Sequence, residues 1–238
     1  MSRTARPATP PATRQRILKV ATEEFANRGF AGARIETIML RSKVSKNLIY
    51  HYFKSKEQLF QSVLEADYER IRLDWVDWPA EGRDPLDAIR DLVGRIFEQW
   101  RKSNQFIKLL ASENFSRGKH IRKMTWIREE YARRIERIAS VLDEGVRRGQ
   151  FRPGIDAAEL YVSISALIYH RIANRYTLSY LLDRSYEDSA SLEACRQHVE
   201  EIVVAYLVQG APHSADEPAG TLAEAGRRGS NGPVTDRG

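Results

Sequence analysis

The sequence predicts an all-α fold, in which an N-terminal three-helix head is attached to a larger bundle of helices. Apolar residues recur at intervals of three and four through most of the chain, and no useful length alternates with the period of two that strands require. Charge is uneven: residues 1–60 carry 12 Lys and Arg against 4 Asp and Glu, although the whole chain of 238 residues has a net charge of only +6. A basic head on a nearly neutral body is typical of a nucleic-acid-binding domain.

The head is predicted to follow a short basic arm. Residues 1–12 contain three prolines and two arginines, a composition that predicts disorder. A first helix is expected to begin near Thr13 and to end at Gly29-Phe30, because glycine followed by an apolar residue is a common helix C-terminus. Ile35 and the residues after it predict a second helix. With a third helix, these segments form a helix-turn-helix domain over residues 13–60, with a small core of Ile17, Phe25, Ile38, Val44, Ile49 and Phe53.

The third helix is expected within Val44–Glu57, which reads VSKNLIYHYFKSKE. Ser45 is a good N-cap for it, and Ser55 with Gln58 forms a capping pattern at the start of the following helix. Three lysines flank the third helix, and polar or aromatic side chains lie between them. Because cations suit phosphates and hydrogen-bonding side chains suit base edges, this segment is predicted to be a DNA recognition helix.

The stretch Ile35–Phe60 resembles the helix-turn-helix of tetracycline-repressor-type (TetR family) transcriptional regulators. The resemblance extends over roughly residues 13–64. It implies a homodimeric repressor that binds a near-palindromic operator in double-stranded DNA and releases it when a small-molecule effector binds the body. The residues that carry it are Val44-Ser45-Lys46, Leu48-Ile49-Tyr50-His51-Tyr52-Phe53 and Lys54-Ser55-Lys56-Glu57.

The resemblance also implies which side chains bind DNA. Some occupy positions that meet base edges or the adjacent backbone (Lys46, Asn47, Tyr50), and others occupy positions that meet phosphates (His51, Tyr52, Lys56). The chain departs from the family's pattern twice, since Ser42-Lys43 replaces the usual Ala-Gly turn and Ala33-Arg34 replaces a Thr cap. Arg34 is expected to offer a cation to a phosphate instead. The predicted DNA-binding set is Arg34, Ser45, Lys46, Asn47, Tyr50, His51, Tyr52 and Lys56.

Residues 61–210 are predicted to form an effector-binding and dimerisation domain. Asp84-Pro85 is an N-cap followed by proline at the first helical position, and apolar residues continue to Trp100 at steps of three and four. Beyond Gly210 the chain is rich in Ala, Gly, Ser, Pro and charge, so residues 211–238 are expected to be a disordered tail. Further apolar stripes predict helices over 106–115, 124–142, 160–169 and 199–208.

The last two predicted helices have more apolar surface than one core needs. Leu160–Tyr169 is apolar on nearly every side, and the stripe that starts at Val199 is unusually wide. A helix without a polar face is covered on both sides. These helices are therefore predicted to form the contact between two subunits, through Leu160, Ile164, Leu167, Val199, Ile202, Val203, Tyr206 and Leu207.

Aromatic residues and scattered polar residues in the body predict a small-molecule site. Polar residues that interrupt a bundle are informative because a buried polar group needs a partner. His170, Asn174 and Thr177 lie near one helix face, which either lines a pocket for a planar or acidic molecule or is solvated. The aromatic rings are either pocket walls or ordinary core. The predicted ligand-binding set is Trp100, Asn114, Trp126, Tyr131, His170, Asn174 and Thr177.

Enzyme, metal and cofactor functions are not expected. The histidines show no His-x-x-x-His pair, Cys195 with His198 is too small a set for a zinc site, and the Ser116-x-x-Lys119 spacing lacks its companion motifs. A single cysteine excludes an internal disulfide, and no apolar run reaches the length of a membrane span, so a cytoplasmic protein is expected.

The alternative to a repressor is a helical small-molecule sensor or scaffold that acts through a protein partner without binding DNA. Lys43 in the turn and the missing Thr cap are the two features that favour this alternative.

Overall fold

The computed structural model describes residues 10–79 and 82–210, and these residues form helices and connecting turns without a strand. The predicted all-α fold is thereby confirmed. The elements are α1 (Pro10–Gly32), α2 (Ile35–Ser42), α3 (Lys46–Phe53), α4 (Lys56–Leu73), α5 (Pro85–Arg101), α6 (Asn104–Phe115), the 3-10 turn η1 (Ile121–Lys123), α7 (Thr125–Arg147), α8 (Ala157–Ala173), α9 (Arg175–Leu181) and α10 (Ser189–Val208).

The two predicted tails fall largely outside the described residues. The tail over 211–238 lies wholly outside them, as do residues 1–9 of the arm. Residues 10–12 of the arm are instead the first turn of α1, which begins at Pro10. Proline is well accommodated there, because the first helical N–H groups have no partner inside the helix.

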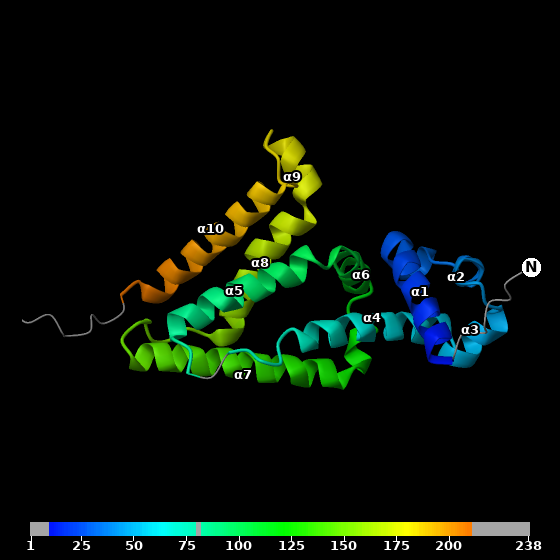
Figure 1. Ribbon diagram of the computed structural model, residues 1–238, viewed down its shortest axis with the longest axis horizontal. Coiled ribbons are helices and arrows are strands. Elements are labelled where there is room, and N and C mark those ends of the chain that lie inside the picture. The colour runs from blue at the N-terminus through cyan, green and yellow to red at the C-terminus, as the bar shows by residue number, and fades with distance from the viewer. Residues whose placement is uncertain (1–9, 80–81, 211–238) are drawn as a thin grey trace, which may run out of the picture.

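The head is formed by α1, α2, α3 and the start of α4, at one end of the molecule (Figure 1). Of the predicted core residues only Val44 is partly exposed. The N-caps are also confirmed, since Ser45 Oγ accepts the Leu48 N–H at 3.2 Å and Ser55 Oγ accepts the Gln58 N–H at 3.1 Å. The buried side chains of the head core include Ile17, Phe25, Ile38, Ile49, Phe53 and Phe60.

Two lysines bracket α3 in backbone conformations with positive φ. Lys43 ends α2 with φ 54°, and Lys54 ends α3 with φ 56°. L-residues enter this region at a cost of about 1–2 kcal/mol, whereas glycine enters it without strain. In the turn before α3, Lys43 thus adopts a positive φ at the position where the usual Ala-Gly turn has glycine.

The body is organised around α5, which packs against α7, α8 and α10. Figure 1 shows α8 rising away from the other helices to α9, and α10 returning beside α8. Trp75 and Trp78, in the turn between α4 and α5, are both buried, with ring centroids 5.7 Å apart. Among the described residues no helix combines the length and hydropathy needed to cross a membrane.

The head contacts the body through more than the α4 connection. Helix α6 of the body packs against α1 of the head, and Figure 1 shows the two helices next to each other. The Phe30 backbone N–H donates to Ser112 Oγ at 3.1 Å, and Lys108 Nζ donates to Asn27 Oδ1 at 3.1 Å. These bonds join residues about eighty positions apart and attach α6 of the body to α1 of the head.

Replacement of Gly145 by alanine is expected to destabilise the protein by about 1–3 kcal/mol or more, through overpacking. A Cβ at Gly145 in α7 would stand 1.9 Å from Cδ2 of Phe151, whose ring is fully buried. Gly94 in α5 is the matched control, because a Cβ there meets nothing within 4 Å. Gly94→Ala should stabilise by about 0.5–1 kcal/mol through helix propensity. Urea unfolding of both variants measures the difference, and equal midpoints would contradict the close approach.

Candidate nucleic-acid interface and effector cavity

Helix α3 presents one buried and one exposed side. Ile49 and Phe53 are buried in the head, while Lys46, Asn47 and His51 are exposed. The Asn47 side chain has no hydrogen-bond partner within the described part of the chain, so its amide is available to donate and to accept. An exposed amide at the start of a helix can read the edge of a base in the major groove.

Lys46 is held by an acidic neighbour. Its Nζ lies 2.8 Å from Oε1 of Glu36 in α2, and both side chains are about half exposed. The hydrogen bond to Lys46 lowers the pKa of Glu36, and the same bond raises the pKa of Lys46. Both groups are therefore charged at neutral pH, and Glu36 offsets part of the charge that Lys46 would offer to a phosphate.

Lys56 occupies the first turn of α4 and also contacts α1. Its Nζ donates to the backbone oxygen of Ala31 at 3.3 Å and lies 5.1 Å from the centroid of the Phe30 ring. Partial burial lowers the pKa of Lys56. This lysine therefore helps to close the C-terminus of α1, in addition to its predicted contact with a phosphate.

The remaining predicted DNA-binding residues surround the same surface. Tyr50 and Tyr52 are half-buried, and the Tyr52 ring lies 5.6 Å from that of His51. Arg34 stands at the N-cap position of α2 without a side-chain cap, because its exposed guanidinium replaces the usual hydroxyl. Its backbone N–H donates to Oε1 of Glu24 at 3.1 Å.

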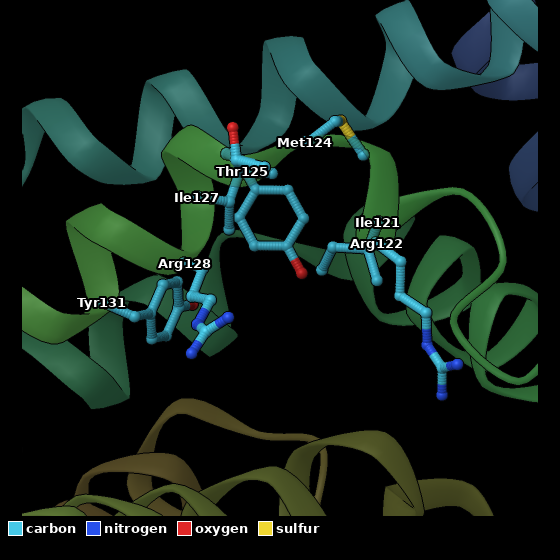
Figure 2. A pocket seen from close by; sticks show the side chains of 8 residues that line it. Ile121, Arg122, Met124, Thr125, Ile127, Arg128 and Tyr131 are labelled. Carbon is cyan, nitrogen blue, oxygen red and sulfur yellow. The ribbon is translucent and has the colours of Figure 1, made fainter.

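A cavity of about 520 Å³ lies between α4, η1 and the start of α7 (Figure 2). Two tyrosines and two arginines line it, together with apolar side chains and one hydroxyl. Burial raises the pKa of both tyrosines, so Tyr68 and Tyr131 are neutral rings at physiological pH. The lining residues are Tyr68, Ile121, Arg122, Met124, Thr125, Ile127, Arg128 and Tyr131.

A second cavity of about 320 Å³ lies between α5, α6 and α8. The Tyr161 ring in its wall lies 6.0 Å from the ring of Tyr131, which lines the first cavity. The rings of Tyr131 and Tyr161 therefore lie in contact with each other between the two cavities. The second is lined by Trp100, Leu110, Asn114, Tyr161, Val162, Ser165, Ala166 and Tyr169.

The structure distributes the predicted ligand-binding residues over several places. Tyr131 lines the first cavity, and Trp100 and Asn114 line the second. Trp126 lines a separate depression with Arg14 of α1 and residues of α4.

The three polar residues of the predicted stripe lie at the exposed corner between α8 and α9. Asn174 Nδ2 donates to the backbone oxygen of His170 at 3.0 Å, and Thr177 Oγ1 donates to that of Asn174 at 2.9 Å. None of the three belongs to the lining of the two cavities above.

Sequence reasoning did not single out Tyr68, Arg122, Arg128 or the buried Arg134. The signal for Arg134 was present in the pattern of α7. Ile127, Tyr131, Arg134 and Ile138 follow one another at steps of four, three and four, which places a cation on the inward face of the helix. A basic residue in register with an apolar stripe is unusual, because long charged side chains are almost never fully buried unless they are paired.

Residues 119–124, here called the junction segment, contact both the cavity and the head. Ile121, Arg122 and Met124 line the first cavity. On the other side, Lys123 Nζ lies 2.9 Å and Lys119 Nζ 3.4 Å from Oε1 of Glu57, in the first turn of α4. Both lysines lower the pKa of Glu57, so this carboxylate is ionised at neutral pH.

Two buried side chains, His120 and Glu113, fix the junction segment. The His120 ring packs between Phe30 and Phe60 of the head, with centroids 4.8 Å from each. Glu113 of α6 accepts the backbone N–H groups of His120 at 2.6 Å and Ile121 at 3.0 Å, and its second oxygen lies 2.7 Å from His120 Nδ1. The Glu113 carboxylate therefore fixes the junction segment, which lies between the first cavity and the head.

The predicted subunit interface divides into two groups of residues. Five of them are buried inside the subunit, where α8 and α10 pack against α5 and against each other: Leu160, Ile164, Val199, Val203 and Leu207. The other three are exposed, at 42% for Leu167, 40% for Ile202 and 46% for Tyr206. Leu167, Ile202 and Tyr206 make up an exposed apolar outer face of α8 and α10; Val208 is exposed as well, whereas the exposed Val162 lines the second cavity.

No group of three or more His, Cys, Asp or Glu side chains within 10–79 and 82–210 is arranged to hold a metal ion. Cys195 is buried, and burial raises the pKa of its thiol.

Two family models match the chain. One, described as bacterial regulatory proteins of the tetR family, matches residues 17–63, and the other, described as a tetracyclin repressor-like C-terminal domain, matches residues 85–203. The first match includes α3, and the second includes the residues that line both cavities except Tyr68 of α4.

The chain is also similar to named regulators. It is 36% identical over 170 residues to the HTH-type transcriptional repressor NicS of Pseudomonas putida, which covers 71% of this chain and 80% of that protein. It is 33% identical to the HTH-type transcriptional repressor SCO4008 of Streptomyces coelicolor, over 66% of this chain and 77% of that protein. Among solved structures, the ketosteroid transcriptional regulator KstR2 of Mycobacterium tuberculosis has the same fold, with a TM-score of 0.64 at 19% identity over 84% of this chain and 97% of that one.

Proposed function

Because this chain belongs to the TetR family of bacterial transcriptional regulators, we propose that it is a homodimeric repressor that a small molecule releases from DNA. Each subunit places α3 in the major groove of one half of a near-palindromic operator. Two relatives that cover most of the chain, NicS and SCO4008, are both named transcriptional repressors, which supports repression over activation.

The junction segment is the observation that carries the release mechanism. It lines the cavity through Ile121 and Arg122, and it holds the first turn of α4 through the ion pairs of Glu57. Helix α4 begins three residues after α3 ends, so a shift of its first turn reorients the recognition helix. A ligand that displaces Arg122 therefore changes the distance between the two recognition helices of a dimer. Typical coupling of this kind is about 1–3 kcal/mol, a 5- to 150-fold change in operator affinity.

The apolar outer face of α8 and α10 supports the dimer. In a two-fold arrangement these helices meet their own copies, which makes a four-helix contact and covers Leu167, Ile202 and Tyr206. Obligate interfaces of this kind bury on the order of 2,000 Å² or more. In the same two-fold arrangement the two heads lie on opposite sides of the axis. They would then bind successive major grooves, which are roughly 34–36 Å apart.

Selection of bound sequences from a random duplex library tests this function directly. We expect a near-palindromic operator and an affinity that falls steeply with salt, because lysines of the head displace counterions from phosphates. A helical sensor that acts through a protein partner would show neither an enriched sequence nor a salt-dependent shift of random DNA. That result would remove the repressor proposal.

Asn47→Ala is expected to lower operator affinity by about 1–3 kcal/mol and to leave affinity for random DNA nearly unchanged, since the exposed amide would read a base edge. The comparison variant is Lys56→Ala, which should weaken both DNAs alike and lower the salt slope by about one. Fluorescence anisotropy titrations on operator and random duplexes, at two or more salt concentrations, measure both effects. Equal losses on the two DNAs for Asn47→Ala would exclude base reading by this residue.

A further inference from the structure

Arg134 in α7 is a fully buried cation without a carboxylate partner. Its exposure is 1%, and it forms no ion pair within the described ranges 10–79 and 82–210. Glu130, one helical turn before Arg134, is engaged elsewhere: its Oε2 lies 2.8 Å from Arg133 Nη2 and its Oε1 lies 3.7 Å from Arg137 Nη2. The helix therefore supplies a counter-charge to its two neighbouring arginines and none to Arg134.

Aromatic rings surround the Arg134 guanidinium in place of acidic groups. Its carbon lies 4.0 Å from the ring centroid of Trp75, 4.6 Å from that of Tyr131 and 6.0 Å from that of Tyr161. Its one hydrogen bond is long, from Nη1 to the Tyr161 hydroxyl at 3.4 Å, and its buried Nε has no acceptor. Cation–π contacts offset part of the cost of removing this charge from water, but a guanidinium has five N–H donors and most of them lack an acceptor here.

The guanidinium lies between the two cavities. Tyr131, which it contacts, lines the larger cavity, and Tyr161, its hydrogen-bond partner, lines the smaller one. Arg134 is therefore separated from the larger cavity by the Tyr131 side chain and from the smaller one by the Tyr161 side chain. The acidic groups that act on Tyr68, in the wall of the larger cavity, have partners of their own, because Glu113 binds the His120 backbone and Asp67 pairs with Arg70 at 3.4 Å.

The larger cavity has a second cationic feature at its rim. Arg122 and Arg128 are exposed, and neither forms an ion pair or a side-chain hydrogen bond with the described residues. Figure 2 shows both guanidinium groups extending to the same side of the cavity, the lower side in that view. Two unpaired cations at the mouth, together with Arg134 behind the Tyr131 ring, raise the local concentration of anions.

From this arrangement we propose that the larger cavity takes a small organic acid with a flat, unsaturated ring, whose carboxylate reaches past the Tyr131 ring to pair with Arg134 while its own ring packs against Tyr68 and Tyr131. The guanidinium fork matches a carboxylate in a bidentate pair, which would satisfy the donors that lack acceptors. The inference rests on the proposed function in that it names the chemical class of the effector. It concerns binding alone, so its test can be separated from the release of DNA.

The test compares acids with their own amides. Benzoate, phenylacetate and trans-cinnamate are each measured against benzamide, phenylacetamide and cinnamamide by thermal shift and calorimetry, on the full-length protein without DNA. We expect at least one acid to bind about 10- to 100-fold more tightly than its amide, the range expected for a charge-assisted, bidentate hydrogen-bonded pair. If every acid binds no better than its amide, or if no acid binds, the proposal is wrong.

Variants of Arg134 locate the effect. Arg134→Met should abolish the preference for the acid, and Arg134→Lys, which keeps the charge without the fork, should retain the preference at reduced affinity. Arg133→Met is the matched control, because Arg133 lies one residue earlier on α7, is exposed and should leave the preference intact. An Arg134→Met protein that folds and keeps the wild-type preference would overturn the proposal. If Arg134→Met does not fold, Arg134→Lys and the wild-type acid–amide comparison decide the question.

The outcomes also separate this inference from the proposed function. An acid that binds through Arg134 but leaves operator affinity unchanged would contradict ligand release and leave the site established. Release of the operator by the amides alone would support the repressor and contradict the carboxylate site.

Discussion

Replacing Ile202 with aspartate is expected to split the proposed dimer and to lower operator affinity by about 10²- to 10⁴-fold. Ile202 lies on the exposed apolar face of α10, beside Tyr206 and opposite the outer face of α8. A charge there must be buried without a partner if the two copies stay together. Once they separate, each head binds its half-site alone and loses the high effective concentration that the linked second head provides.

Sedimentation velocity and operator titration of the same preparation measure the two effects. Val76→Asp is the control, because Val76 is an exposed apolar residue in the turn between α4 and α5 and belongs to neither α8 nor α10. Val203 is a poor choice for this test, since it is buried inside the subunit and an aspartate there would unfold the chain. An Ile202→Asp protein that sediments as a dimer with wild-type affinity would show that subunits meet elsewhere.

Glu113→Ala is expected to cost about 3–5 kcal/mol of unfolding free energy, because the buried His120 and Ile121 donors would lose their acceptor. The junction segment would then open locally, and the backbone N–H groups of His120 and Ile121 should exchange with solvent much faster. Since this segment joins cavity and head, ligand binding should also lose its effect on the operator. Urea unfolding and hydrogen exchange measure the first two effects, and operator titration with ligand measures the third.

Two further variants make the Glu113 experiment decisive. Glu113→Gln keeps one oxygen acceptor and should cost less than half as much. Asn114→Ala changes the next residue of α6, which is exposed and bonds within its own helix, at 3.0 Å to the Leu110 oxygen. It should unfold like the wild type. Wild-type stability for Glu113→Ala would mean that the junction segment is held by the packing of His120 against Phe30 and Phe60.

Local features were predictable from the sequence because short-range chemistry sets them. Ser45, Ser55 and Asp84 are N-caps as expected, since a cap depends only on residues within one turn. The head as a whole followed from three such helices and their apolar spacing. The roles assigned to individual side chains at the DNA surface remain predictions, because they depend on the bound duplex.

The cavity was harder to predict because it depends on contacts between distant segments. Tyr68 of α4 meets Ile121 and Tyr131 only after the chain has folded back over fifty residues. The polar stripe of His170, Asn174 and Thr177 assumed one continuous helix, whereas α8 ends at Ala173 and α9 begins at Arg175. Leu160–Tyr169 is apolar on nearly every side and the stripe from Val199 is wide. The spacing of apolar residues therefore could not decide which side chains of α8 and α10 face α5.

The two lysines at positive φ around α3 tie the salt tolerance of DNA binding to the thermal stability of the head. Lys43 and Lys54 each store backbone strain that glycine would relieve, yet each also brings a cation to the edge of the recognition helix. A variant with glycine at either position would unfold at a higher temperature and would keep the same operator affinity only at a lower salt concentration. Selection for heat resistance would therefore favour glycine at positions 43 and 54, and selection for DNA binding at high salt would favour lysine there.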